Sequence, residues 1–209
     1  MTKEIYLIRH GETTFNKLGI VQGSGVDTDL NEIGQKQAAA FYERYKEVPF
    51  EVVLTSKLKR THQTVQHFIE KGLAWEQFSE INEMSWGIHE GMAYTPERKV
   101  QYNSIIEEWD KENYDVGMEE GETINELAAR CGAFVAQLRQ RTEEHILICA
   151  HGRLNRCLLC VLLDLPLRHM NDFSHSNTGL YRLRFDGEQF ELLSNNDTQH
   201  LNVQELTAI

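Results

Sequence analysis

The chain has 209 residues, of which 41% are hydrophobic and 25% charged, and its formal net charge is −11 at pH 7. This length and balance are typical of one globular domain whose core is large enough to need no disulfide or metal. The negative charge argues against nucleic acid and anionic membranes as partners, because both are negatively charged themselves.

The first residues predict neither a signal peptide nor a membrane anchor. Only four apolar residues, 5–8, follow Lys3 and Glu4, and no apolar run approaches the length of a membrane span. Four cysteines in such a chain are typical of reduced thiols. With three prolines and no Gly/Ser-rich linker, we expect a single domain over residues 1–209 and a cytoplasmic location.

The first half of the chain alternates strand-like and helix-like segments. Residues 4–8 predict a buried strand, and residues 32–46, preceded by the candidate N-cap Asn31, predict a helix. A short strand is predicted at 52–54. The helix that follows it runs to about residue 71 and has Ser56 as its candidate N-cap.

The second half continues this alternation. Residues 122–142 predict a helix from an apolar stripe at Leu127, Cys131, Phe134 and Leu138. A buried strand is predicted at 146–149 and a helix at 153–163. Residues 179–185 and 189–194 predict a hairpin turned at Asp186-Gly187.

Strands that alternate with helices predict an α/β fold, in which a mostly parallel central sheet is flanked by helices on both faces as three α/β/α layers. Residues 92–120 break the alternation and predict a helical lid excursion. Their end belongs to an acidic stretch of eight carboxylates: Glu107, Glu108, Asp110, Glu112, Asp115, Glu119, Glu120 and Glu122. Two interpretations stay open, a solvated helical insertion and a lid that shapes ligand choice.

The string Arg9-His10-Gly11-Glu12-Thr13 directly follows the first predicted strand. Glycine allows a tight turn in which the backbone approaches a ligand closely. An arginine fork binds phosphate oxygens, and a neutral imidazole nitrogen can attack phosphorus. The motif therefore favours phosphoryl chemistry over a structural His-Arg pair.

A second His-Gly pair, His151-Gly152, follows the strand predicted at 146–149. Ligands of open parallel sheets bind beyond the carboxyl ends of strands, where the strand order reverses. If the two strands are neighbours, His10 and His151 meet over one pocket. The helix that begins near Gly152 would favour an anion there.

Two further candidates come from other segments. Arg60 lies one turn into the helix after the second strand, although a solvated arginine would fit that lysine-rich stretch equally well. Glu83 and Glu90 are both candidate proton donors, and the residues alone do not separate them. The pair Cys157-x-x-Cys160 lies inside a predicted helix without a second pair and is interpreted as packing.

These motifs, in this order, resemble the histidine phosphatase superfamily, also called the phosphoglycerate mutase-like family, and its small phosphatase branch. The resemblance covers almost the whole chain through Arg9-His10-Gly11-Glu12-Thr13, Asn16, Gln22-Gly23, Asp29-Leu30, Gly34, Gln37-Ala38, Ser56-x-Leu58-x-Arg60, Thr64, Glu83, Gly87, Glu90-Gly91, Gly121-Glu122-Thr123, His151-Gly152, Asn177-Thr178-Gly179, Asn196-Asp197 and His200-Leu201. The chain departs from the family at Asn31, usually Thr, and at Thr61, commonly Ala. Neither departure touches the expected chemistry.

The resemblance implies a role for each matching residue. His10 would be the nucleophile and form a phosphohistidine, while Arg9, Arg60 and His151 hold the phosphoryl oxygens and stabilise the transition state. Glu83 would protonate the leaving oxygen and then activate water.

Asn16, Gln22, Gly23 and Gly152 would complete the phosphate- and substrate-binding set. No metal or other cofactor is expected, because two arginines and a cationic histidine supply the positive charge. The remaining histidines show no metal-ligand spacing. The expected partner is a small phosphorylated metabolite, and a homodimer is possible.

Three functions compete. The first is a phosphomonoester phosphatase, the second a cofactor-dependent phosphoglycerate mutase that returns the phosphoryl group to substrate, and the third a catalytically silent binding module. The complete set of catalytic candidates disfavours the silent module. The short chain, the segment after Glu83 and the acidic lid, whose charges would repel a bisphosphorylated intermediate, favour the phosphatase.

Overall fold

A computed structural model describes residues 2–201 and contains one six-stranded sheet. The strand order is β3-β2-β4-β1-β5-β6, with β1, β2, β3 and β4 mutually parallel and the β5–β6 hairpin antiparallel. The strands are β1 Lys3–Arg9, β2 Val52–Ser56, β3 Ala74–Phe78, β4 His145–Ala150, β5 Leu180–Phe185 and β6 Phe190–Asp197. The predicted mostly parallel sheet and its terminal hairpin are confirmed.

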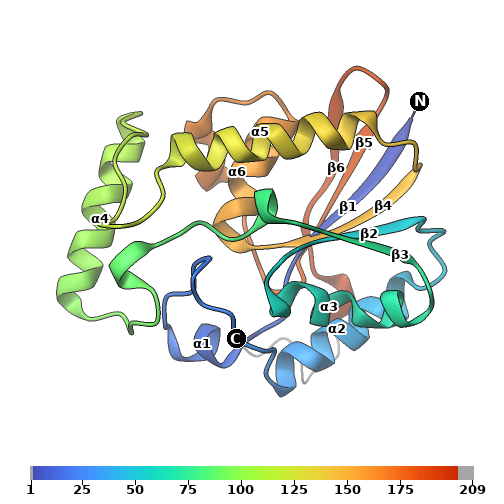
Figure 1. The fold of residues 1–209 in the computed structure, drawn as a ribbon, viewed down its shortest axis with the longest axis horizontal. Coiled ribbons are helices and arrows are strands. Elements are labelled where there is room, and N and C mark those ends of the chain that lie inside the picture. Colours follow the sequence, from blue (N-terminus) through green and yellow to red (C-terminus); the bar gives the residue numbers. More distant parts are fainter. Residues whose placement is uncertain (1, 202–209) are drawn as a thin grey trace.

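Helices cover both faces of this sheet (Figure 1). Helices α2 and α3 pack on one face and α5 and α6 on the other, so the predicted α/β/α layers are confirmed. The helices are α1 Thr14–Leu18, α2 Glu32–Tyr45, α3 Lys59–Glu70, α4 Pro96–Asp110, α5 Ile124–Gln140 and α6 Gly152–Leu162, with 3-10 turns η1 Ser79–Ile81, η2 Gly87–His89, η3 Leu167–Asp172 and η4 Gln199–Leu201. None of the helices within residues 2–201 combines the length and apolarity that a bilayer crossing needs.

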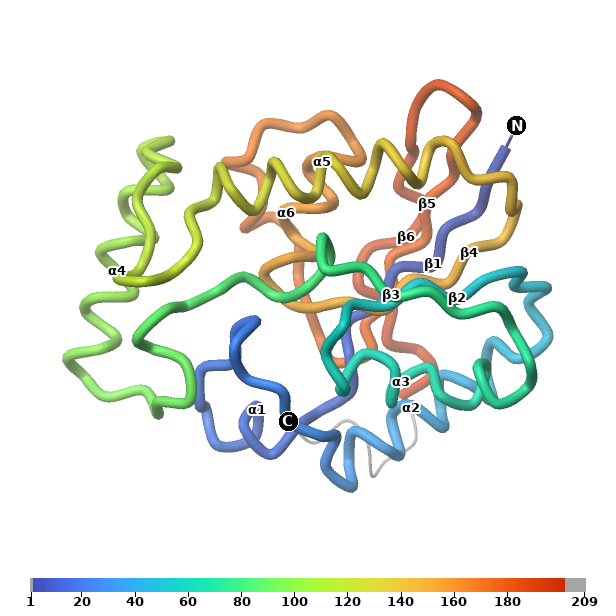
Figure 2. The backbone as a smooth tube through the Cα atoms, viewed as in Figure 1, coloured from blue at the N-terminus to red at the C-terminus, as the bar shows by residue number. Residues whose placement is uncertain are grey.

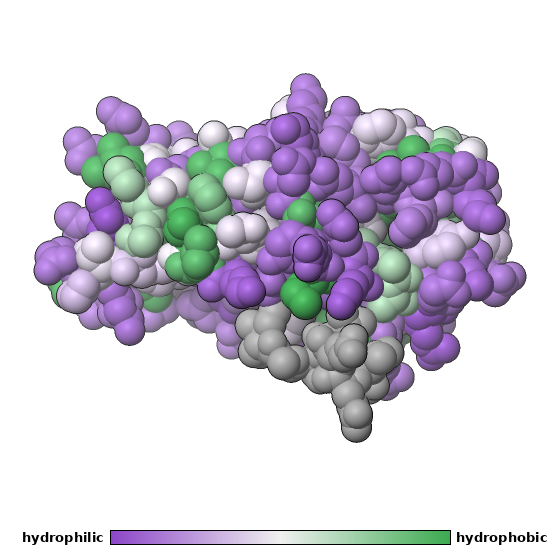
Figure 3. All heavy atoms as spheres, turned by 90° about the horizontal axis from the view of Figure 1, so that it is seen from below, coloured by the Kyte–Doolittle hydropathy of each residue, from purple (hydrophilic) through white to green (hydrophobic). Residues whose placement is uncertain are grey.

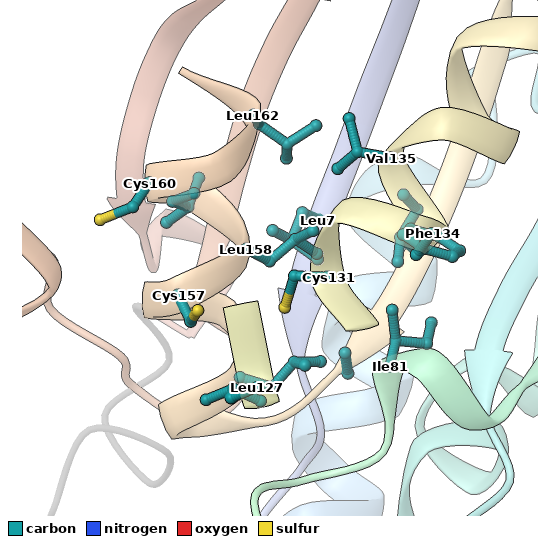
Figure 4. Close-up of a cluster of buried hydrophobic side chains, with 14 of the residues drawn as sticks. Leu7, Ile81, Leu127, Cys131, Phe134, Val135, Cys157, Leu158, Cys160 and Leu162 are labelled. Atoms are coloured by element: carbon teal, nitrogen blue, oxygen red, sulfur yellow. The ribbon is translucent and has the colours of Figure 1, made fainter. Parts of the chain in front are cut away.

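The predicted apolar stripe of α5 forms part of the larger core. Leu127, Cys131, Phe134 and Leu138 are all buried, and the Thr123 side chain caps the helix by accepting a hydrogen bond from the Glu126 N–H. Figure 4 shows the sulfur-bearing side chains of α5 and α6 among leucines and phenylalanine. All four cysteines are free and buried, and burial raises the pKa of Cys160 to about 12. Cys157 and Cys160 therefore serve packing.

Two elements were not predicted. The edge strand β3, Ala-Trp-Glu-Gln-Phe, is mostly exposed and has no apolar run; its pairing with β2 makes it a strand. The five-residue helix α1 buries no side chain and depends on a capping box of Thr13 and Asn16. Sequence patterns that detect burial miss both, because neither is buried.

The proposed N-cap of α3 is wrong. Ser56 is the last residue of β2, and Leu58 occupies the cap position without a side-chain hydrogen bond. The Ser56 hydroxyl instead accepts the Leu58 N–H and contacts His151. Asn31, by contrast, caps α2 as predicted, because its side chain accepts the Gly34 N–H.

The strands that end in His-Gly are direct neighbours, since β1 and β4 pair in parallel with Arg9 opposite Ala150. The chain leaves β1 towards α2 on one face and leaves β4 towards α6 on the other, as the tube of Figure 2 shows. This divergence opens a crevice at the carboxyl edge of the sheet. The strand order therefore reverses between β1 and β4, as the sequence argument required.

Segments 86–95 and α4 extend beyond the sheet at the end of the molecule that carries this crevice (Figure 2). A backbone bridge between Ile20 and Ala93 joins this extension to the loop after α1. The surface seen in Figure 3 is mostly hydrophilic, with hydrophobic residues gathered over the same end. Exposed large apolar side chains there are Leu18, Ile88, Met92, Tyr94 and Val100.

The turn that carries His10 packs directly on the start of α2. A Cβ added to Gly34 would lie 2.1 Å from the Glu12 carbonyl oxygen, and one added to Gly11 would lie 2.7 Å from the Gly34 carbonyl oxygen. Both neighbours are backbone atoms, which cannot rotate away. This close approach fixes the loop after β1 against the helix.

We therefore expect Gly34→Ala to destabilise the protein by about 1–3 kcal/mol through overpacking. Gly132→Ala is the matched control, because Gly132 lies in α5 with nothing within 4 Å of its added Cβ. That substitution should stabilise by roughly 0.5–1 kcal/mol, since alanine is the better helix former. Urea unfolding of both variants gives the comparison; a neutral Gly34→Ala would contradict the packing argument.

Candidate active site

His10 and His151 meet at the carboxyl edge of the sheet, each one residue beyond its strand. Their ring centroids are 5.3 Å apart, and both side chains are buried. The spatial pairing predicted from the two His-Gly motifs is therefore present.

The hydrogen bond of His10 leaves one ring nitrogen available. Its Nδ1 lies 2.7 Å from the Gly11 carbonyl oxygen, which can only accept, so Nδ1 carries the proton. Burial, and then the charges of Arg60 and Arg9, lower the pKa of His10 well below its ordinary value. The ring is therefore neutral at pH 7, with a lone pair on Nε2.

Two guanidinium groups flank this imidazole, and neither makes an ion pair with a carboxylate of residues 2–201. Arg9 donates to the His175 carbonyl oxygen at 2.7 Å, and Arg60 donates to the carbonyl oxygens of Val26 at 2.7 Å and Gly23 at 3.2 Å. The Nε atoms of both arginines are buried and lack a hydrogen-bond partner within the described residues. Burial lowers the pKa of Arg60 to about 10, so it stays charged at neutral pH.

His151 contributes a third buried nitrogen without a partner. Its Nε2 lies 2.8 Å from the Ser56 hydroxyl, while its Nδ1 has no hydrogen-bond partner among residues 2–201. Burial, followed by Arg60 and His10, lowers the pKa of His151 well below its ordinary value. The expectation of a cationic histidine is therefore wrong for this structure, because the buried ring is neutral at pH 7 and the two arginines supply the positive charge. His151 also holds the N-cap position of α6. Together with both arginines it makes a polar cradle that a tetrahedral oxyanion would satisfy.

The carboxylate of Glu83 is held by backbone amides. Its Oε1 accepts the N–H groups of Met84 and Leu154, each at 2.9 Å, and its Oε2 accepts the N–H of Arg153 at 3.1 Å. Two of these donors belong to the first turn of α6, where the helix dipole favours a negative group. Glu83 is also the single carboxylate that lines the pocket within the described residues.

Glu90, the rival proton donor, has a different position. Its Oε1 accepts the Trp86 N–H at 2.9 Å, and its Oε2 accepts the Gly25 N–H at 2.8 Å. It therefore ties the loop that holds Arg60 to the segment after Glu83, and it does not line the pocket. Of the two candidate proton donors, Glu83 is the one that lines the pocket.

Arg130 fixes the segment that carries Glu83. Its guanidinium donates to the carbonyl oxygens of Glu80 and Asn82, each at 2.7 Å, and of Glu83 at 3.2 Å. The same group makes a two-pronged ion pair with Glu122, at 2.6 and 2.9 Å. Arg130 of α5 therefore orders the loop that carries Glu83, and the motif spacing did not predict this contact.

A pocket of about 260 Å³ opens beside His10. Of the predicted binding residues, Asn16, Gln22 and Gly152 line it together with Arg9, His10 and Glu83. Arg60 and His151 are buried and are not lining residues, and Gly23 contacts Arg60 through its carbonyl oxygen. The remaining lining residues are Phe15, Gly19, Ile20, Val21, Trp86, Tyr94, Tyr102, Arg153, Arg156 and His175.

Sequence reasoning missed the cations on α6. Arg153 and Arg156 lie two and five residues after His151, and His175 comes from the loop before β5. The sequence spacing could have identified the two arginines. Because Arg153 and Arg156 are three residues apart, they lie on one face of the helix that begins at Gly152.

The lid excursion contributes aromatic residues to the pocket. Trp109 is buried against Trp86, their ring centroids 6.1 Å apart, and Tyr94 and Tyr102 line the pocket. The eight carboxylates of residues 107–122 are not lining residues. The expected repulsion of a bisphosphorylated intermediate therefore gains no support from direct contact, because those acids lie outside the pocket.

Comparisons with known proteins identify relatives that match most of this chain. A family model described as histidine phosphatase superfamily (branch 1) matches residues 5–198. Phosphoserine phosphatase 1 of Hydrogenobacter thermophilus is 28% identical over 200 residues, covering 95% of this chain and 94% of that protein. The Yersinia pestis protein named "Probable phosphoglycerate mutase GpmB" is 29% identical over 220 residues, covering 99% and 98%.

A solved structure shares the fold over nearly its whole length. The phosphoserine phosphatase of Entamoeba histolytica, in complex with 3-phosphoglyceric acid, superposes with a TM-score of 0.82 at 25% identity and covers 95% of this chain and 99% of that one.

The neutral, buried state of His10 predicts a pH dependence of stability. Below about pH 6.5 the unfolded imidazole binds a proton that folded His10, with its lowered pKa, does not. The free energy of unfolding should therefore fall from pH 7 to pH 5. His10→Asn removes this contribution and should reduce that fall by up to about 2 kcal/mol. Equal pH dependence of variant and parent in urea titrations would contradict it.

Proposed function

The chain belongs to the histidine phosphatase superfamily, and we propose that it hydrolyses phosphate monoesters of small metabolites through a phosphohistidine on His10. The observation that carries the proposal is a neutral imidazole, with a free Nε2, buried beside two guanidinium groups that make no direct ion pair with a carboxylate of residues 2–201. Such a site holds a nucleophile ready and attracts the dianion that it attacks.

In the first step, the Nε2 lone pair of His10 forms a bond to phosphorus while the bond from phosphorus to the ester oxygen breaks. The Nε groups of Arg9 and Arg60 and the Nδ1 of His151 would donate to the equatorial oxygens, where charge is spread in the transition state. Glu83, in its protonated form, gives its proton to the departing alkoxide, which leaves as the alcohol.

In the second step, the Glu83 carboxylate takes a proton from water as the water oxygen attacks phosphorus. The bond between phosphorus and Nε2 breaks, inorganic phosphate leaves, and His10 recovers its lone pair. Glu83 ends protonated, ready for another cycle. The amides of Arg153 and Leu154 keep its carboxyl group at the pocket wall throughout.

The mutase remains a second candidate because of the full-length similarity to the Yersinia pestis protein. In that reaction the phosphoryl group returns to a phosphoglycerate instead of passing to water. Both candidates use His10, so the fate of the phosphoryl group decides between them.

Four free cysteines, all buried, support a reducing compartment such as the cytoplasm. The edge strand β3 offers unpaired backbone to a second copy, which supports the homodimer expected from the sequence.

The first test is release of inorganic phosphate from a panel of phosphomonoesters without added metal, 3-phosphoglycerate included. We expect release by the parent protein and a loss on the order of 10⁴-fold or more in His10→Ala. Phosphate release by folded His10→Ala would refute the mechanism. Conversion of 3- to 2-phosphoglycerate in the presence of bisphosphoglycerate, without net phosphate release, would favour the mutase.

The second test addresses the acid. Glu83→Gln should slow alkyl phosphates by about 10²–10⁴-fold and p-nitrophenyl phosphate much less, because p-nitrophenolate leaves without a proton. The isosteric amide can keep both contacts on Oε1. Glu90→Gln is the control and should affect both substrates alike, since Glu90 only ties loops together. Equal losses on both substrates in Glu83→Gln would assign the acid elsewhere.

A further inference from the structure

The peptide group between His10 and Gly11 is held at both ends by distant segments of the chain. The Gly11 N–H donates to the Thr64 hydroxyl of α3 at 2.8 Å. The His10 carbonyl oxygen accepts the side-chain amide of Asn177 at 3.0 Å and the Thr178 N–H at 3.4 Å. Because Nδ1 of His10 donates to the Gly11 carbonyl oxygen, the orientation of this backbone sets the orientation of the imidazole ring.

Thr178 makes its contacts from a backbone conformation that threonine rarely adopts. Its φ is +52°, in the left-handed region, where a β-branched side chain is sterically hindered. In this conformation its N–H lies 3.1 Å from the Arg9 carbonyl oxygen, in addition to its contact with His10. Such strain persists only where the surrounding structure fixes the residue, and it is concentrated at functional sites.

The side chain of Thr178 is bonded to a histidine that follows the β5–β6 hairpin. The Thr178 hydroxyl lies 2.9 Å from Nε2 of His200 in η4, and both side chains are buried. Burial lowers the pKa of His200 to about 4, so a neutral ring shares this hydrogen bond at pH 7. The ring packs edge-on against Phe41 of α2, their centroids 5.3 Å apart. His200 therefore ties Thr178 to the helix layer.

The residues on either side of Thr178 are held independently by Asn196 of β6. The Asn196 Oδ1 accepts the Ser176 N–H at 2.9 Å, and its Nδ2 donates to the Ser176 hydroxyl at 3.0 Å. A Cβ added to Gly179 would lie 2.1 Å from the same Oδ1, so Asn196 packs closely on the far side as well. Loss of the Thr178 hydroxyl is therefore a local change that leaves the loop anchored.

We infer that Thr178, held by its hydrogen bond to His200, is a positioning residue for His10, keeping the backbone after β1 in the orientation that leaves the Nε2 lone pair of His10 free. Without the bond, Thr178 can relax towards negative φ and turn its N–H away from the carbonyl oxygens of Arg9 and His10. The carbonyl of Gly11 then loses its fixed orientation, because glycine has wide conformational freedom. The kinetic consequence rests on the proposed function, whereas the protonated nitrogen of His10 is measurable without substrate.

Thr178→Val tests the inference, because it removes the hydroxyl and keeps the β-branched shape. We expect kcat/KM for p-nitrophenyl phosphate to fall by about 10- to 100-fold, since a misoriented nucleophile slows the reaction step. The inhibition constant of inorganic phosphate should stay within about threefold of the parent, because the arginines that bind it are untouched. Thr178→Ser keeps the hydroxyl and should recover most of the activity.

The spectroscopic signature is the tautomer of His10 in the protein without substrate. Two-bond ¹H–¹⁵N NMR spectra distinguish a ring protonated on Nδ1 from one protonated on Nε2, and the spectrum of His10→Asn assigns the signal. The parent should show the Nδ1–H tautomer that the contact with the Gly11 carbonyl oxygen requires. Thr178→Val should show a mixture of both tautomers, and Thr178→Ser should resemble the parent.

Thr55→Val is the matched control. Thr55 is as deeply buried as Thr178, and its hydroxyl accepts the Trp75 Nε1–H at 2.9 Å. Its loss removes one buried hydrogen bond without contact to His10, so kcat/KM should stay within about threefold of the parent. His200→Phe removes Nε2 and keeps a ring against Phe41. It should reproduce Thr178→Val, and the double variant should be no slower than either single variant.

Three results would overturn the positioning role: unchanged kcat/KM in folded Thr178→Val, an equal loss in Thr55→Val, or losses that add in the double variant. A complete Nδ1–H tautomer in Thr178→Val would overturn it as well. Absence of His10-dependent phosphate release from the parent would instead refute the proposed function, and the NMR comparison would still decide the positioning of His10. If Thr178→Val fails to fold, His200→Phe carries the same measurements from the other side of the bond.

Discussion

The parallel pairing of β1 with β4 is the constraint on which the rest of the site depends. It places the residues after both strands in one crevice, where His10 and His151 come within contact distance. Because the following helices lie on opposite faces, that crevice stays open to a ligand. The first turn of α6 then supplies the amides that hold Glu83, so one strand pair organises His10, His151 and Glu83.

Buried positive charge is the second feature that connects fold and chemistry. A phosphatase of this acidic composition must attract a dianion locally, and its site offers buried arginines that make no direct ion pair with a carboxylate in the described part of the chain. Burying Arg60 costs stability, which its two backbone carbonyl contacts offset only in part. Burial, and then the same charges, lower the pKa of His10 and keep the ring neutral, and a neutral ring is what nucleophilic attack requires.

Segment 92–120 contributes aromatic side chains to the pocket, which its acidic sequence did not suggest. Its carboxylates lie outside the pocket, whereas Tyr102 and Trp109 pack with Arg153 on the inner side. Arg153 also donates its backbone N–H to Glu83, so one residue of α6 contacts both this segment and Glu83.

The sequence by itself determined the buried strands, the major helices and the two histidines, because apolar periodicity and strand-end motifs are local signals. It could not determine β3 or α1, which bury little and exist through pairing and capping. Nor could it choose between Glu83 and Glu90, or exclude Ser56 as a helix cap. Those decisions depend on which backbone amides and side chains lie nearby after folding, and only the tertiary structure brings α6 to Glu83, Ser56 to His151 and Arg156 to the pocket.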